Sequence, residues 1–113
     1  MKTTKLNGAA LDWAVAMCEG VTNGNALDVG FIREGGYTPS TNWAQGGAII
    51  EREAITILST ESGEWCAAIG ELYYEDNEPR SPTPLIAAMR CYVANKLGDE
   101  VQIPEALINE NAY

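Results

Sequence analysis

Residues 36–47 hold the side chains best suited to contact a ligand. The segment combines two aromatic rings, three aliphatic hydroxyls, two amides and three glycines, a mixture that core packing alone does not explain. Pro39 fixes one backbone φ angle, and Ser40 or Thr41 can cap a following helix by accepting from its first N–H groups. A helix N-terminus offers N–H donors and the positive end of the helix dipole. The segment therefore predicts a binding loop that leads into a helix N-terminus.

A second helix start of this kind is predicted at Thr83, directly after a polar, proline-containing loop over residues 76–82. If the fold brings the two N-termini together, their N–H groups and dipoles make a cradle for an anion. The alternative is that both termini are capped by their own side chains and bind nothing. The sequence leaves both interpretations open.

Aromatic and basic side chains supply the remaining chemistry of a nucleotide-like ligand. Tyr37 and Trp43 can stack on a planar group such as a base, and Arg52 or Arg90 can neutralise a phosphate. Arg90 can instead pair with a neighbouring carboxylate and have only a structural role. The predicted ligand-binding residues are Tyr37, Thr38, Ser40, Thr41, Trp43, Gln45, Gly46, Gly47, Arg52, Thr83 and Arg90.

No pattern in the sequence indicates catalysis. The chain has no histidine, no Gly-x-Ser-x-Gly elbow and no phosphate loop of the Walker type. Carboxylate pairs such as Glu51 with Glu53, or Asp99 with Glu100, are commonplace surface spacings. Without histidines or paired cysteines a transition-metal site is not expected, and a hard-cation site would need carboxylates alone. We therefore expect a protein that is not an enzyme and holds no metal or cofactor.

The three cysteines, Cys18, Cys66 and Cys91, lie far apart in the chain and are odd in number. This pattern suits reduced thiols in a cytoplasm better than a disulfide framework. Each cysteine lies in an apolar stretch, which indicates buried packing rather than reactivity.

The charge balance disfavours direct binding to nucleic acid. The net charge is −9, from 16 acidic and 7 basic residues, and the basic residues are not concentrated in the sequence. No apolar run approaches the roughly 18 residues that a membrane span needs, and no signal peptide is predicted. One acidic segment is either a solvated loop or a mimic of DNA, and its charged residues are Glu71, Glu75, Asp76 and Glu78.

Several long blocks of the sequence carry a family resemblance. They read GAALDWAVA at residues 8–16, YTPSTNWAQGG at 37–47 with IIERE at 49–53, PTPLIAAMRCYV at 82–93 and KLGDEV at 96–101. Together the blocks resemble the NinX-like family of small proteins from tailed phages and prophages, over nearly the whole chain. The resemblance implies a phage gene expressed inside a bacterium and supplies no activity.

A weaker similarity, to the phage ABA-sandwich domain, implies helices around a small antiparallel sheet. A chain of 113 residues fits one domain, residues 1–113, and a globule of this size buries roughly two thirds of its unfolded surface. We predict an α+β fold in which a three-stranded antiparallel β-meander packs with about three α-helices.

Three helices are predicted from their start and stop signals. The first begins after Asn7 as N-cap and ends at Gly20, and the second runs from about residue 41 to about residue 52. The third opens with Thr83 as N-cap and a proline in its first turn, and it ends at Gly98. All three carry an apolar face for the core.

Two adjacent glycines, Gly46 and Gly47, stand in the middle of the second helix. Each costs roughly 1 kcal/mol relative to alanine inside a helix. Either the helix breaks here, or another helix or a ligand approaches the bare backbone closely.

The remaining segments divide into strands, loops and a tail. Residues 21–36 are interpreted as a loop with a short strand around residues 29–32, and residues 105–113 as a tail of uncertain order. The strands of the meander are predicted over residues 54–60, 64–69 and 72–75, with a turn at 61–63.

We therefore expect a non-catalytic phage accessory protein that acts by binding in the host cytoplasm. The favoured target is a small anionic or nucleotide-like ligand, and one concrete version is counter-defence by sequestering a nucleotide signalling molecule. The alternative is an inhibitor or adaptor of a host protein, including acidic DNA mimicry. A homodimer or larger assembly is expected, because a domain this small has limited depth for a pocket.

Overall fold

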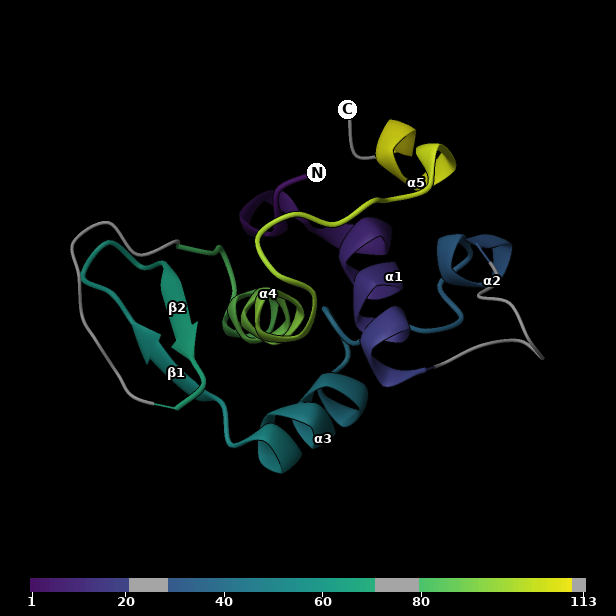
Figure 1. The fold of residues 1–113 in the computed structure, drawn as a ribbon. Helices are drawn as coiled ribbons and strands as arrows, with labels where there is room; N and C mark the ends of the chain where they lie inside the picture. The colour runs from purple at the N-terminus through teal and green to yellow at the C-terminus, as the bar shows by residue number, and fades with distance from the viewer. Residues whose placement is uncertain (21–28, 71–79, 111–113) are drawn as a thin grey trace.

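The computed structural model describes residues 1–20, 29–70 and 80–110 (Figure 1). Within these ranges the chain forms helices and one small antiparallel sheet, so the predicted α+β class is confirmed. In chain order the elements are the 3-10 helix η1 (Thr3–Lys5), α1 (Gly8–Glu19), α2 (Val29–Arg33), α3 (Trp43–Glu53), β1 (Thr56–Ser59), β2 (Trp65–Ala68), α4 (Pro84–Leu97) and α5 (Glu105–Glu110).

Helix α4 lies at the centre of the fold, between the sheet and α1, and α3 packs against it as well (Figure 1). Its buried residues lie on more than one side of the helix, as expected for a helix that packs against the sheet on one side and α1 on another. Full burial of such side chains contributes about 1.5–3 kcal/mol each. The core includes Leu6, Leu11, Val15, Ile49, Met89, Tyr92, Val93, Val101, Ile103 and Leu107.

The predicted starts and stops of two helices agree with the structure. Thr83 caps α4 by accepting from the Ile86 N–H, and Gly98 follows the last turn. Gly20 ends α1 in the left-handed region at φ 68°, a conformation that favours glycine. Asn7 stands at the N-cap position of α1, but the predicted capping bond is wrong, because its side chain accepts none of the helix N–H groups.

The sheet contains two strands in the described part of the chain. The hairpin β1–β2 and its turn were predicted within two residues at each end, and Ser59 pairs with Trp65 in its register. The predicted third strand, at residues 72–75, lies outside the described residues. At the edge of β2 opposite β1, Ser81 exchanges two backbone hydrogen bonds of 2.8 Å with Trp65. The three-stranded meander and the helices surrounding it are therefore not confirmed.

One segment was predicted incorrectly, and the order of another was left open. Residues 29–32 form a helix rather than a strand, because a helix places Val29 and Ile32 on the same side, where both pack inward. The predicted tail contains α5, which is anchored by the fully buried side chain of Leu107. Among the described residues no helix has the length and hydropathy to cross a membrane.

Candidate functional site

The N-termini of α3 and α4 meet at a cavity of about 210 Å³, here called the cap cavity. The fold thus brings together two loops that are about forty residues apart in the chain, as the cradle hypothesis requires. The cavity is lined by Ser40, Thr41, Trp43, Thr83, Pro84, Leu85 and Ile86. Four of these were predicted as ligand-binding residues: Ser40, Thr41, Trp43 and Thr83.

Both helix N-termini at the cap cavity are capped by neutral side chains. Asn42 Oδ1 accepts from the N–H groups of Ala44 at 2.8 Å and Gln45 at 3.3 Å, and Thr83 Oγ1 accepts from Ile86 N–H at 3.1 Å. Neither helix has an acidic residue in its first turn. The positive ends of both dipoles therefore face the cavity region without a protein carboxylate in either first turn.

The prediction that Ser40 or Thr41 caps α3 is wrong, since Asn42 has that role. Ser40 is buried instead, and its N–H donates to Asp12 Oδ1 at 2.8 Å. Burial raises the pKa of Asp12, and its contacts with Ser40 partly offset this rise. The carboxylate of α1 thus holds the loop that leads into α3.

Asp12 was missed by the sequence analysis. The signal that could have revealed it is a carboxylate inside an otherwise apolar helical run, because such a group is retained where it accepts a buried hydrogen bond. The Ser40 hydroxyl is buried beside this carboxylate, and its contact with Asp12 helps to lower the carboxyl pKa although it does not reach hydrogen-bond geometry among the described residues.

Helix α3 does not break at its glycines, and only one of them is required by packing. A Cβ on Gly46 would lie 2.4 Å from the Pro39 carbonyl oxygen and 2.6 Å from Leu85 Cδ1. A Cβ on Gly47 would meet only the Trp43 ring, at 3.8 Å. The expected close approach is therefore real at Gly46, and what approaches is this chain's own backbone and α4.

Three other predicted residues stabilise the loop and do not line the cap cavity. Gln45 Oε1 accepts from the Thr38 N–H at 2.7 Å, which ties the loop to the first turn of α3. Tyr37 packs half-buried against the core, and burial together with the Glu19 carboxylate raises its pKa to about 12. Trp43, by contrast, is 56% exposed, and its ring is accessible at the edge of the cap cavity.

Arg52 belongs to a cluster of paired charges and does not line the cap cavity. Its two terminal nitrogens donate to Glu19 Oε1 at 2.9 Å and Oε2 at 2.6 Å, and Nε donates to Glu53 at 2.9 Å. The Tyr92 hydroxyl also donates to Glu19. Lys96 lies 3.6 Å from Glu53 and completes this group, here called the Arg52 cluster.

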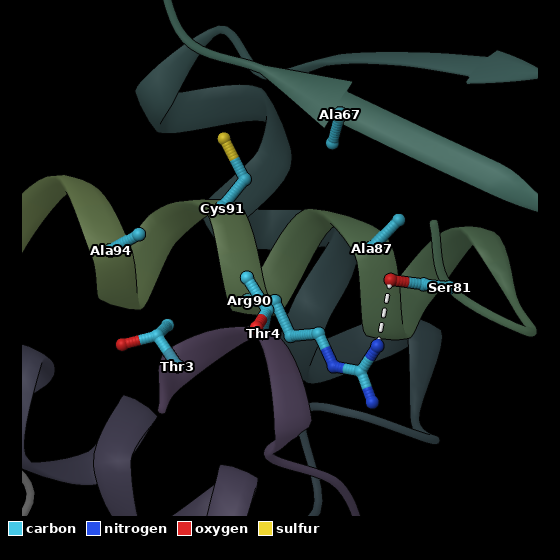
Figure 2. A pocket seen from close by; sticks show the side chains of 8 residues that line it. All are labelled: Thr3, Thr4, Ala67, Ser81, Ala87, Arg90, Cys91 and Ala94. Atoms are coloured by element: carbon cyan, nitrogen blue, oxygen red, sulfur yellow. Dashed lines mark hydrogen bonds between the residues drawn. The ribbon is translucent and has the colours of Figure 1, made fainter. Parts of the chain in front are cut away.

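Arg90 opens onto a second cavity of about 210 Å³, here called the Arg90 cavity (Figure 2). Its Nε donates to the Leu6 carbonyl at 2.6 Å, and Nη1 donates to Ser81 Oγ at 3.0 Å. The anticipated pairing with a carboxylate is not found among the described residues. The cavity is lined by Thr3, Thr4, Ala67, Ser81, Ala87, Arg90, Cys91 and Ala94.

No group of three or more potential metal-ligating side chains occurs in residues 1–20, 29–70 and 80–110. The three cysteines are half-buried and form no disulfide with one another. Burial, with the nearby Glu19, raises the pKa of the Cys18 thiol to about 11, which keeps it protonated at neutral pH.

Comparison with known families identifies the chain. A family model described as Bacteriophage P22, NinX matches residues 2–96. The chain belongs to the NinX family. The matched region contains every residue that lines the cap cavity and the Arg90 cavity, whereas α5 lies beyond it. A comparison of this NinX protein with curated proteins found no match.

Proposed function

We propose that this NinX protein is a non-catalytic phage accessory protein that binds a small anionic, nucleotide-like ligand in the cap cavity. The observation that carries the proposal is the convergence of two helix N-termini, neither with an acidic residue in its first turn, in a protein of net charge −9. Acidic residues in a first turn normally stabilise a helix. The neutral caps, Asn42 and Thr83, occupy some of the first N–H groups, and the proposal rests on the part of the positive potential that no first-turn carboxylate offsets.

In this proposal Trp43 contacts the base of the ligand. Its ring is exposed beside the cavity and can stack on a base, which contributes about 1–3 kcal/mol per base in nucleic-acid complexes. A volume of about 210 Å³ is smaller than the roughly 300–1,000 Å³ of sites for drug-sized ligands. The cavity therefore suits the phosphate or sugar part of a ligand whose base lies outside, against Trp43.

The phage origin of the family supports a role in the host cytoplasm. A binding protein without catalytic groups acts on a signalling nucleotide by lowering its free concentration, which is the counter-defence version of the proposal. A second copy of the chain would deepen the shallow cavity, which supports assembly as a homo-oligomer. Sequestration of this kind needs protein in at least stoichiometric amounts.

The test is isothermal titration of the folded protein with a panel of nucleotides and cyclic nucleotides. Binding of one member, lost in Trp43→Ala and kept in Phe31→Ala, supports the proposal, since Phe31 is an exposed aromatic that does not line the cavity. The absence of heat with every nucleotide would exclude the ligand version.

A protein partner is the second candidate, and the exposed Trp43 favours it. An aromatic that is 56% exposed on an acidic surface suits an inhibitor or adaptor of a host protein. The acidic segment invoked for DNA mimicry, at residues 71–78, lies outside the described residues. A complex recovered from host lysate and lost with Trp43→Ala or with charge reversal in that segment supports this candidate.

A further inference from the structure

Arg90 differs from an ordinary structural arginine because its described partners are neutral. It is half-buried, and its hydrogen bonds go to a backbone carbonyl, at Leu6, and to a hydroxyl, at Ser81. Burial lowers the pKa of Arg90, although a guanidinium stays charged at neutral pH. Burial of a charge is costly unless the charge is paired, so a half-buried cation that has no counter-charge among the described residues favours the binding of an anion.

The Arg90 guanidinium has N–H donors that make no hydrogen bond to the described residues. Of the five N–H groups of an arginine, the described residues use one on Nε and one on Nη1. The remaining donors are on the two Nη nitrogens, in the planar fork that matches two oxygens of a carboxylate or a phosphate. The bonds to Leu6 and Ser81 fix the direction in which this fork points.

The other walls of the Arg90 cavity suit a compact anion with a small apolar body. Hydroxyl groups come from Thr4 of η1 and from Ser81 at the β2 edge, whereas the Thr3 hydroxyl, also in the lining, donates to the Gly98 carbonyl at 2.7 Å. Figure 2 shows Ala67 of β2 facing Ala87 and Cys91 of α4 across the opposite side of the cavity. The polar and apolar groups thus lie on different sides of a cavity of about 210 Å³.

We propose that the Arg90 cavity is a second ligand site of this NinX protein, and that it takes a compact oxyanion, a phosphate or a carboxylate carried on a small apolar group. The site is independent of the proposed function, because the two cavities share no lining residue. They use different residues of α4: its first turn lines the cap cavity, and its Ala87, Arg90, Cys91 and Ala94 line the second site.

The experiment is a titration of the ¹⁵N-labelled full chain with inorganic phosphate and, separately, with propionate, followed by NMR. Saturable shifts of the Thr4 and Ala94 amides and of the Arg90 Nε–H support the site, and the anion that produces them identifies its class. Absence of saturable shifts there with both anions overturns it, as do shifts confined to Thr41 and Trp43.

Two variants and a control make the result specific. Arg90→Lys keeps the charge and loses the fork, so we expect at least about tenfold weaker binding. Ala94→Leu fills the cavity from a half-buried position and should abolish binding, with a native spectrum as proof of folding. Trp43→Ala should bind the anion as the wild type does. Unchanged binding by both Arg90→Lys and Ala94→Leu would refute the site.

Discussion

The Arg52 cluster and the Arg90 cavity use the same side chain in opposite ways. Arg52 is half exposed, yet its guanidinium donates to two carboxylates and to the Tyr92 hydroxyl. Arg90 is half-buried, yet its described partners are a carbonyl and a hydroxyl. Exposure alone therefore does not show which arginine is available to a ligand. The hydrogen-bond partners of each guanidinium are the better guide.

The comparison also separates an arginine whose charge is paired with carboxylates, Arg52, from one whose described partners are neutral, Arg90. In the Arg52 cluster Glu19 joins the C-terminal ends of α1 and α3 to Tyr92 of α4, so its charges connect three helices. The hydrogen bonds from Arg52 hold the pKa of Glu19 below its ordinary value. The Arg90 cavity makes no such closed network in the described chain, because Arg90 lines the cavity and its described partners are a carbonyl and a hydroxyl.

The largest effect is expected from removing the centre of the Arg52 cluster. Glu19→Ala should lower the free energy of unfolding by about 2–3 kcal/mol, because it removes a bidentate ion pair and leaves the buried Tyr92 hydroxyl without its acceptor. Urea denaturation measures the change. Glu51→Ala, an exposed acidic residue of α3, is the matched control and should stay within about 0.5 kcal/mol of wild type. Equal values for the two variants would contradict a structural role for the cluster.

Arg90→Met tests the other side of the comparison. It should cost about 1–2 kcal/mol, because the Leu6 carbonyl and the Ser81 hydroxyl lose their donor. The cost should be the same in dilute and in 1 M salt, whereas that of Glu19→Ala should shrink, since salt screens partly exposed ion pairs. Denaturation at both salt concentrations distinguishes the regions, and a salt-sensitive Arg90→Met would reveal a counter-charge.

Acidification should weaken the Arg52 cluster specifically. A carboxylate with a lowered pKa in the folded protein contributes stability above its unfolded pKa, which is 4.5 for Glu19, and loses it as the pH falls through the lower folded value. Between pH 7 and pH 3 the wild type should therefore lose more stability than Glu19→Gln does. Asp12 acts in the opposite direction, because burial raises its pKa, but it is present in both proteins. Parallel curves of stability against pH would argue against the cluster.

The smallest effect concerns the turn that follows the Arg52 cluster. Ala54 adopts φ 53°, the left-handed region that glycine occupies without strain, and it ends α3 directly after Glu53. Ala54→Gly should raise the free energy of unfolding by about 0.5–1 kcal/mol. Thermal denaturation would detect the gain, and Ala48→Gly, at an exposed helical position, should lower stability by a similar amount. Destabilisation by Ala54→Gly would show that this turn carries no strain.

The sequence predicted what local signals specify. Thr83 and the proline after it start α4, Gly20 ends α1, and the turn at 61–63 joins the two strands. It did not predict features that arise from distant contacts. The Ser40 N–H donates to Asp12, 28 residues away, which holds Ser40 in the loop before α3. The residue that caps α3 is Asn42.

The same reasoning explains the two arginines. Arg52 and Arg90 were equivalent candidates for a phosphate, because each lies in a helix with an apolar face and the sequence shows no fixed partner. The tertiary structure places Glu19, from 33 residues earlier in the chain, against Arg52. It places the carbonyl of Leu6, from 84 residues earlier, against Arg90. Such pairings depend on how the helices dock, which no local pattern records.

Gly46 sets the spacing of the cap cavity. Since the Pro39 carbonyl and the Leu85 side chain already occupy the space where a Cβ would stand, Leu85 of α4 packs directly on the backbone of α3 at this point. A receptor whose walls are held in this way loses little conformational entropy when a ligand enters. For the ligand proposed for the cap cavity, the association rate should then depend on diffusion and charge rather than on rearrangement, and differences in affinity between ligands should lie mainly in their dissociation rates.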